Sequence, residues 1–171
     1  MIEKTEEIIK FEKIADKWWD PNSEFRPLHQ INPLRLSWID NAVGGLKGRK
    51  VLDLGCGGGI LSEAMSKKGA EVLGVDPAEK SIKIAKIHAE KCGSNVQYEY
   101  SSSEDLVSKD KKFDVITCME MLEHVDDPEM EIKNCAALLK PSGCLVIATI
   151  NRNLNSFLVA IVGAEYVLKL L

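Results

Sequence analysis

Short apolar runs alternate with longer amphipathic segments between residues 49 and 150. The apolar runs predict strands at 50–54, 71–75, 95–100, 113–118 and 144–149, and the amphipathic segments predict helices at 59–68, 78–91 and 128–139. Strands that alternate with helices form βαβ units around a parallel sheet, and right-handed crossovers place helices on both of its faces. The pattern therefore predicts an α/β fold with a mostly parallel, doubly wound sheet.

A helical segment, residues 1–48, precedes this core. Apolar residues from Ile8 to Trp18 recur at helical spacing, and Pro21 is expected to end that helix. Asn32 followed by Pro33 has the form of an N-cap and a first helical position, so a second helix is expected to begin there. We interpret the segment as a helical cover of the core. The chain is expected to form one domain, because 171 residues suffice for a single hydrophobic core.

The last segment, residues 151–171, has a polar start and continues with the apolar sequence SFLVAIVGAEYVLKLL. A helix that crosses a bilayer needs about 20 apolar residues. This apolar stretch is shorter, and Glu165 and Lys169 interrupt it. Two interpretations stay open, a helix that lies at a membrane interface and a buried helix or lid.

Composition and charge narrow the class of protein. The net charge is −4, which argues against a nucleic-acid partner because such proteins usually carry a basic surface. Five cysteines without a C-x-x-C pair argue against a disulfide framework or a zinc knuckle, and they favour a reducing, cytoplasmic compartment. The first residues lack the apolar core of a signal peptide and are too acidic for a transit peptide.

A glycine-rich turn follows the first predicted strand, in the sequence VLDLGCGGG of residues 51–59. Glycines at this place let the backbone approach a ligand and leave N–H groups free at the start of the next helix. Gly55 and Gly57 fit the dinucleotide motif G-x-G-x-x-G, but Ile60 stands where its third glycine belongs. Asp76, at the end of the second strand, has the spacing of an acid that binds ribose hydroxyls.

Asp53 indicates which of the candidate ligands the glycine turn binds. Its carboxylate, two residues before Gly55, would repel a pyrophosphate, which argues against a nicotinamide-dependent oxidoreductase. It suits a ligand with an ammonium and a sulfonium group through charge-assisted hydrogen bonds, and S-adenosylmethionine carries both groups. The spacing of Asp53, the glycines and Asp76 is similar to motif I of the class I methyltransferases, which have a Rossmann-like fold.

A second cluster of polar residues follows the fourth strand, in the sequence MEMLEH of residues 119–124. At helical spacing Glu120, Glu123 and His124 share one face. An oxygen-rich set of this kind favours Mg²⁺, and a divalent cation lowers the pKa of a hydroxyl that must lose its proton to accept a methyl group. His124 could instead accept that proton itself. Both roles stay open, as does a third interpretation in which the two glutamates are solvated acids and the histidine is a cap.

Longer motifs carry a closer resemblance. The sequences FEKIADKWWDPNSEFRPLHQINPLRLSWI, CMEMLEHVDDP and INRN, together with the apolar last segment, resemble those of the ubiquinone-biosynthesis O-methyltransferases. The resemblance runs from Phe11 to the last residue. It implies an enzyme that methylates a polyprenylated catechol, and later a demethylated quinol, with S-adenosylmethionine.

The resemblance also implies roles for particular residues. Met119 is expected either to pack on the adenosine of the cofactor or to be plain core. An aromatic cover over the cofactor and the phenolic ring is expected from Trp18, Trp19, Phe25 and His29, although the tryptophans could instead be simple core. The full set of expected cofactor contacts is Arg35, Asp53, Gly55, Gly57, Asp76, Glu104 and Met119. The expected metal ligands are Glu120, Glu123 and His124, with Glu120 and His124 as the catalytic residues.

A lipid-linked substrate implies peripheral association with the inner membrane through the last segment, and contacts with other ubiquinone-biosynthesis proteins. One departure qualifies the expected fold, because members of the class continue past this point and the predicted sheet is therefore truncated after the fifth strand. A sheet of that kind leaves an edge and some core surface uncovered. A non-catalytic module that binds the cofactor or a lipid is accordingly the alternative to an active enzyme.

Overall fold

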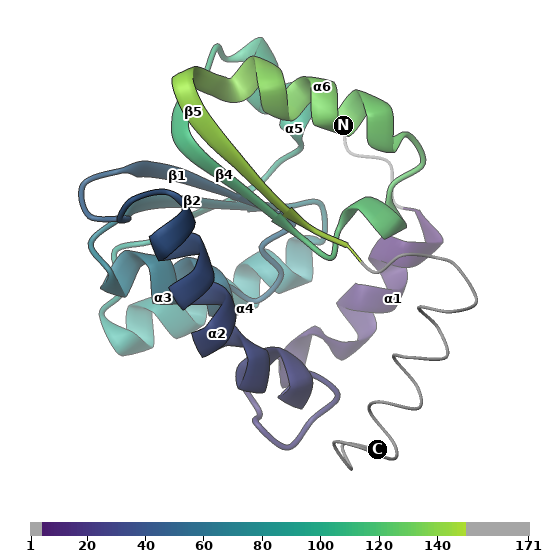
Figure 1. Ribbon diagram of the computed structural model, residues 1–171. Helices are drawn as coiled ribbons and strands as arrows, with labels where there is room; N and C mark the ends of the chain where they lie inside the picture. The colour runs from purple at the N-terminus through teal and green to yellow at the C-terminus, as the bar shows by residue number, and fades with distance from the viewer. Residues whose placement is uncertain (1–4, 150–171) are drawn as a thin grey trace, which may run out of the picture.

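A five-stranded parallel sheet forms the centre of the protein, in the strand order β3-β2-β1-β4-β5. The computed structural model describes residues 5–149 (Figure 1). The strands are β1 (Lys50–Leu54), β2 (Glu71–Asp76), β3 (Gln97–Tyr100), β4 (Phe113–Met119) and β5 (Leu139–Ala148). Each of the five predicted strands is confirmed, and the first matches its predicted bounds.

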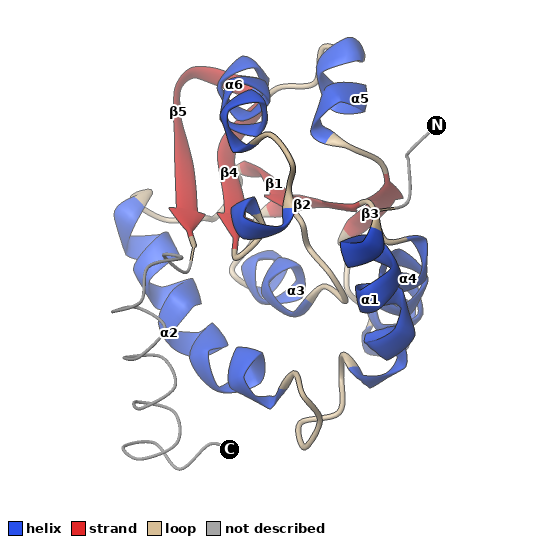
Figure 2. Cartoon of the chain, turned by 90° about the vertical axis from the view of Figure 1, so that its right-hand side faces the viewer, coloured by secondary structure: helices blue, strands red, loops and turns tan. Residues whose placement is uncertain are grey.

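Helices cover both faces of the sheet, as Figure 2 shows edge-on. One face carries α2 (Arg26–Ala42), α3 (Ile60–Lys67) and α4 (Glu79–Cys92), and the other carries α5 (Ser103–Ser108) and α6 (Pro128–Leu138). The N-terminal α1 (Glu6–Ile14) and the 3₁₀ turn η1 (Ala15–Lys17) pack against α4. The predicted doubly wound α/β fold is confirmed.

Alternating side chains of the central strands build a core on each face. Val51 and Val115, which are register partners in β1 and β4, point to the side of α3 and α4. Leu52 and Ile116, the next pair along, point to the side of α5 and α6. All four are completely buried, so the central strands are apolar on both faces, as in parallel sheets between two helical layers.

The strand order reverses between β1 and β4, because the chain runs outward from β1 to β3 and then returns to the other side of β1. In open α/β sheets, ligands bind at the carboxyl ends of the strands beside such a switch point. The glycine turn follows β1 and the MEMLEH sequence follows β4, so both lie at this place.

The predicted start of the second helix at Asn32 is wrong. The helix α2 begins at Arg26 and contains Pro33 in its interior, although a proline there removes one backbone hydrogen bond. Tertiary packing explains the difference. Phe25, directly before the helix, is buried and stacks on Trp18 with ring centroids 3.8 Å apart, and this contact holds the first turn in place.

Two further boundaries differ from the predictions. The strand β5 begins at Leu139 rather than at residue 144, because Leu139 pairs with Phe113 before a register shift that accommodates Pro141. Proline is tolerated at such an irregularity and on a strand that is the edge of the described sheet. The short helix α5 was not predicted, although Ser102 caps it by accepting a hydrogen bond from the Asp105 N–H.

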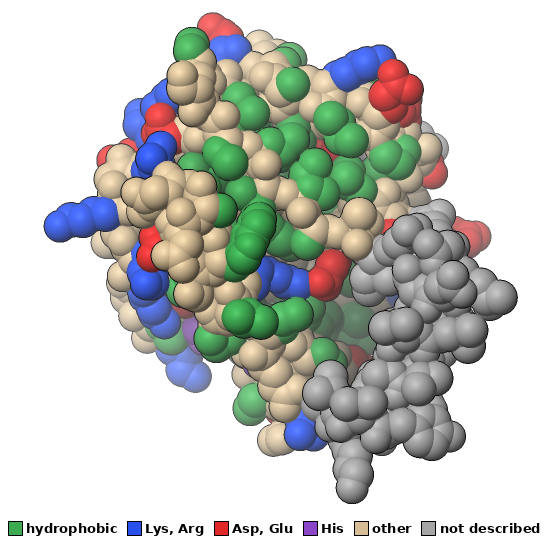
Figure 3. Space-filling view, in the orientation of Figure 1, with side chains coloured by type: hydrophobic (Ala, Val, Ile, Leu, Met, Phe, Trp, Pro, Cys, Tyr) green, Lys and Arg blue, Asp and Glu red, His purple; other side chains and the backbone are tan. Residues whose placement is uncertain are grey.

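Hydrophobic side chains gather on the face of the molecule shown in Figure 3. Among the residues that the structure describes, Leu34 and Trp38 on α2 are 71% and 61% exposed. No helix within residues 5–149 has both the length and the apolar character needed to cross a bilayer. The apolar segment SFLVAIVGAEYVLKLL lies outside the described residues, so both interpretations of it stay predictions.

We expect Ile116→Ala in β4 to lower the free energy of unfolding by about 2–5 kcal/mol, because it removes a fully buried side chain between two packed layers. Ile87→Ala is the matched control, since Ile87 on α4 is 61% exposed and its loss should change the same quantity by less than about 0.5 kcal/mol. Urea denaturation measures both. Equal effects of the two substitutions would contradict the assignment of the core.

Candidate functional site

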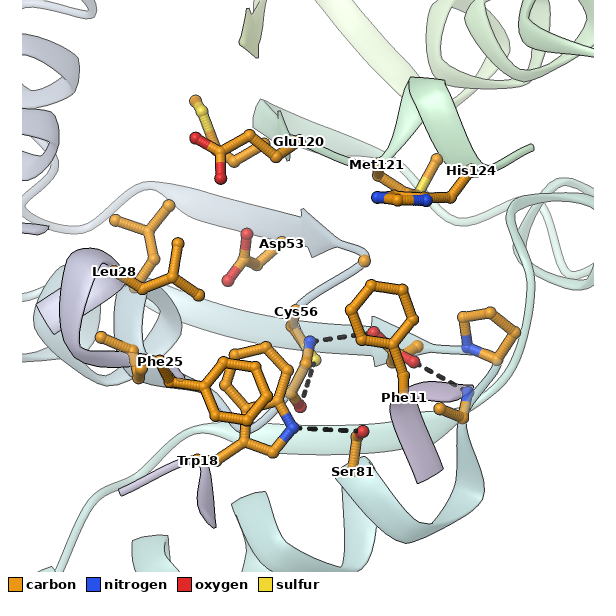
Figure 4. A pocket seen from close by; sticks show the side chains of 18 of the residues that line it. Phe11, Trp18, Phe25, Leu28, Asp53, Cys56, Ser81, Glu120, Met121 and His124 are labelled. Atoms are coloured by element: carbon orange, nitrogen blue, oxygen red, sulfur yellow. Dashed lines mark hydrogen bonds between the residues drawn. The ribbon is translucent and has the colours of Figure 1, made fainter. Parts of the chain in front are cut away.

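A cavity of about 310 Å³ opens at the carboxyl ends of β1, β2 and β4. Figure 4 shows Glu120, Met121 and His124 on one side of it and Trp18 across from them, on the other. The chain segments that meet here are the N-terminal cover, the glycine turn after β1, the end of β2 and the residues after β4. The two sequence motifs that predict a site therefore line the same cavity.

Asp53, the fourth residue of β1, is 3% exposed and lines the cavity. Its carboxylate accepts hydrogen bonds from the hydroxyl of Ser62 in α3 and, at 2.7 Å, from the hydroxyl of Thr117, its register partner in β4. Burial raises the pKa of the Asp53 carboxyl, while these two hydrogen bonds and the charge of Arg35 oppose the rise. A positive charge in the cavity would stabilise the carboxylate, because it would offset the cost of burying it.

Asp76 ends the neighbouring strand β2 and is buried at the same edge of the sheet. Its carboxylate accepts hydrogen bonds from the backbone N–H groups of Gly57, at 2.9 Å, and Ala78, at 2.7 Å. Burial raises the pKa of Asp76 to about 6, against these two bonds. The side chain thus ties the glycine turn to the end of β2 and lines the cavity.

The glycine turn is covered by an indole ring. Gly57 has a φ of +53°, and a Cβ added to it would lie 2.5 Å from the ring of Trp18. Trp18 is itself held by its stack on Phe25 and by a hydrogen bond of 3.3 Å from its Nε1 to the hydroxyl of Ser81. A side chain at Gly57 would therefore displace the cover, and both Gly57 and Trp18 line the cavity.

The neighbouring residues of the cover also contact this turn. Trp19 donates from Nε1 to the carbonyl of Gly58 at 2.9 Å, and the ring of His29 contacts the carbonyl of Trp18 at 2.8 Å. Of the predicted aromatic cover, Trp18 and Phe25 line the cavity, while Trp19 and His29 support it from behind. These contacts give Trp19 and His29 a structural role behind the glycine turn.

Arg35 and Glu120 form an ion pair across the cavity. Arg35 belongs to α2, and its side chain is 13% exposed. Glu120 follows β4 with a φ of 54°, and its N–H donates to the carbonyl of Ala148 in β5 at 2.6 Å. Met119 lines the cavity beside it, as does Gly55 on the glycine turn.

The sequence MEMLEH does not form one turn of α-helix. Only Leu122–His124 is helical, as the 3₁₀ turn η2, and the left-handed backbone of Glu120 sets that residue apart. His124 pairs through Nδ1 with Glu7 of α1 at 3.0 Å, and its ring meets Phe11 edge-on at 5.3 Å. Glu123 accepts a hydrogen bond of 2.8 Å from Thr149. The predicted shared helical face is therefore wrong.

These side chains do not form one set of metal ligands in this arrangement. Among residues 5–149, the three donor atoms that all lie within 4.8 Å of one another belong to Glu63, His88 and Cys92. Glu120 and His124 are instead paired with Arg35 and Glu7. A magnesium ion at this cluster would require those pairs to separate first.

Glu104 is exposed in the first turn of α5 and does not line the cavity, so its cofactor contact stays a prediction. Sequence reasoning missed Ser62 and Thr117, which hold Asp53. A signal for Thr117 exists in the sequence, since a lone hydroxyl inside the apolar strand FDVITCM needs a buried partner. It also missed Glu7, whose pairing with His124 joins residues far apart in the chain.

Sequence comparison finds known proteins that are similar to this chain over most of its length. A family model described as "Methyltransferase domain" matches residues 28–166. The ubiquinone biosynthesis O-methyltransferase of Leptothrix cholodnii is 59% identical over 167 residues, which cover 96% of this chain and 71% of the relative. The protein of the same name from Acinetobacter baylyi is 56% identical over 168 residues, with 97% and 71% covered.

Solved structures show the same fold. The PH0226 protein of Pyrococcus horikoshii OT3 superposes with a TM-score of 0.68 at 26% identity, over 91% of this chain and 71% of that one. Magnesium protoporphyrin IX methyltransferase of Synechocystis PCC 6803, a structure with bound SAH, gives a TM-score of 0.71 at 23% identity, over 92% and 74%. The fold, the cavity and these matches together define a Rossmann-like methyltransferase. The chain belongs to the ubiquinone biosynthesis O-methyltransferase family.

The raised pKa of Asp76 predicts a dependence of stability on pH. The folded protein holds the Asp76 proton more tightly than the unfolded chain, with a pKa of about 6 against 3.8, so this residue favours folding most in acid. That contribution is lost as the pH rises through about 6. Relative to Asp76→Asn, the free energy of unfolding of the wild type should fall by about 2–2.5 kcal/mol between about pH 4 and pH 7.5.

Urea denaturation over this pH range tests the prediction. Asp110→Asn is the control for the loss of one carboxylate, because the side chain of Asp110 is 92% exposed and lies outside the cavity. A wild type that gains stability relative to Asp76→Asn as the pH rises would show that the carboxylate is better stabilised in the folded state than its burial indicates.

Proposed function

We propose that the protein transfers the methyl group of S-adenosylmethionine to a phenolic hydroxyl of a polyprenylated catechol and of a demethylated quinol. The observation that carries the proposal is the pair of buried carboxylates, Asp53 and Asp76, that end adjacent strands beside the glycine turn and line one cavity. Membership of the ubiquinone biosynthesis O-methyltransferase family supports the substrate class. Solved methyltransferases of the same fold with bound SAM or SAH support the donor.

Each carboxylate fits a different part of the donor. Asp53 would face its ammonium and sulfonium charges, which offset the cost of a buried carboxylate. Asp76 would accept hydrogen bonds from the ribose hydroxyls, as acids at the end of the second strand do in related nucleotide sites. Trp18 and Met119 line the cavity where they could cover the remaining apolar surface.

Arg35 could take part in a partner exchange when the donor binds. Its guanidinium pairs with Glu120, and it is well shaped to receive the carboxylate of the donor instead. Such an exchange would release Glu120 into the cavity, which both residues line. We therefore assign Arg35 to donor binding and Glu120 to the acceptor side of the cavity.

The acceptor hydroxyl must lose a proton, since a phenol has a pKa near 10 and its oxygen attacks best as the phenolate. His124 lines the cavity and is the histidine in position to take that proton. The phenolate oxygen then forms a bond to the methyl carbon while the carbon–sulfur bond breaks. The sulfonium leaves as the neutral thioether S-adenosylhomocysteine, and His124 carries the proton away as an imidazolium.

Binding of Mg²⁺ by Glu120, Glu123 and His124 stays a prediction. Glu120, Glu123 and His124 are of the right chemical type for a metal site, but as placed they do not fit one ion. A bound divalent cation would lower the pKa of the phenol. The reaction described above does not pass through such an ion, because the proton acceptor is a side chain of the protein.

A lipid-linked acceptor predicts that the enzyme works at a membrane surface while the rest of the protein stays in the cytoplasm. Exposed apolar side chains on α2, among them Leu34 and Trp38, support such a contact. The last apolar segment, residues 151–171, stays the predicted membrane contact. Other ubiquinone-biosynthesis proteins also stay predicted partners.

We expect Asp53→Asn to weaken the affinity for S-adenosylmethionine by about 10- to 100-fold, because the amide cannot stabilise the positive charges of the donor. Isothermal titration calorimetry with S-adenosylmethionine measures the loss directly. Asp110→Asn again serves as the control and should bind as the wild type does. An unchanged affinity in Asp53→Asn would remove the observation on which the proposed function depends.

His124→Gln should lower kcat for a short-chain prenyl catechol by about 10²- to 10⁴-fold at neutral pH, because it removes the proton acceptor. Its affinity for the donor should change little, and a rate that recovers at high pH would support the role. The same assay with EDTA, and then with added Mg²⁺, tests the metal prediction. A rate that is unaffected by the chelator would contradict a magnesium requirement, and a fully active His124→Gln would contradict the role of His124.

A further inference from the structure

A second cluster of ligand-type side chains lies outside the cavity, between α3 and α4. Glu63 of α3 contacts His88 of α4, and His88 contacts Cys92 one turn further along the same helix. Their donor atoms all lie within 4.8 Å of one another. None of the three lines the cavity, so the proposed methyl transfer does not account for them.

We propose that Glu63, His88 and Cys92 form a site for a borderline-soft divalent cation such as Zn²⁺. Imidazole and thiolate ligands are those that zinc prefers in proteins. Residues four apart on a helix share one face, which brings His88 and Cys92 together. The distance between His88 Nε2 and Cys92 Sγ is 3.5 Å. Two ligands at tetrahedral positions around zinc, one at about 2.1 Å and one at about 2.3 Å, lie about 3.6 Å apart.

Glu63 has the place of the carboxylate that orients a metal-bound histidine. Its Oε1 lies 2.7 Å from His88 Nδ1. Because a carboxylate accepts hydrogen bonds, this contact fits the tautomer that carries its proton on Nδ1, and that tautomer presents the lone pair of Nε2 toward Cys92 and a metal. Such carboxylate–histidine–zinc arrangements fix the tautomer and raise the basicity of the ligand. The ring of Trp19 stacks on the face of the His88 ring and helps to fix its plane. The two ring centroids lie 3.4 Å apart, with an interplanar angle of 4°.

The burial of Glu63 is a separate observation that favours a cation here. Its side chain is 1% exposed, and its Oε2 is buried without a hydrogen-bond partner among the residues that the structure describes. A carboxylate withdrawn from water in this way is costly unless positive charge lies close to it. A divalent cation on the far side of the imidazole supplies that charge.

The metal side of the cluster is open to solvent. Cys92 is a free, exposed cysteine, and the His88 side chain is 22% exposed, so an ion can reach Nε2 and Sγ directly. Water would complete the coordination. Because the ligands come from α4 and the orienting carboxylate from α3, a bound ion would fasten these two helices to each other.

Cobalt replacement tests the proposal on the full chain, under reducing conditions and without donor or acceptor. Co²⁺ should produce a thiolate-to-cobalt charge-transfer absorption band, and Zn²⁺ should abolish it by competition. The band should be lost in Cys92→Ser and in His88→Gln. Cys144→Ser is the matched control, because Cys144 is half-buried and lies outside the cluster, and it should keep the band.

Two further variants complete the experiment. Glu63→Gln should lower the zinc affinity by about 10- to 100-fold, the usual effect of losing an orienting carboxylate. His124→Gln should leave it unchanged. Zinc should also raise the Tm of the wild type but not that of Cys92→Ser. A band that survives Cys92→Ser, or one that His124→Gln removes, would overturn the proposal and place the ion elsewhere, without bearing on methyl transfer.

Discussion

The burial of the Asp53 carboxylate at the switch point of the sheet is the constraint on which the site depends. An acid in the central strand of a parallel sheet is tolerated only if hydrogen bonds satisfy it, and the hydroxyls of Ser62 and Thr117 do so. They come from the next helix and from the neighbouring strand, so forming the sheet also positions the acid. The cost that remains would favour a cationic ligand, because a nearby positive charge offsets the burial of a carboxylate.

The fold was largely predictable because its signals are local. Apolar runs and amphipathic periods marked every strand and the helices α3, α4 and α6, and Asp76 was recognisable as an acid at the end of a strand. Two failures have a common physical cause. The start of α2 is decided by the stacking of Phe25 on Trp18, and the start of β5 by pairing of Leu139 with Phe113. Neither contact has a signal in the segment itself.

The sequence predicted which residues line the site better than it predicted which of their side chains pair with each other. Asp53, Gly57 and Met119 line the cavity as the sequence motifs indicate. That Arg35 pairs with Glu120 depends on how α2 crosses the end of the sheet, and helical periodicity carries no information about that crossing. The left-handed backbone of Glu120 was equally hidden, because glutamate has no local preference for it.

The cover and the sheet have separate hydrophobic cores. Ala15, Trp18, Phe25 and Ile60 form a small cluster of their own, apart from the two that flank the sheet. Small clusters of this kind open at a lower free energy than the core and often do so as cooperative units. Because Ala15, Trp18 and Phe25 pack in this separate cluster, opening of the cover would disrupt neither of the cores that flank the sheet. If the donor binds in the cavity as proposed, it could enter and its demethylated product could leave without unfolding of the core, and opening of the cover would then be a step able to limit turnover.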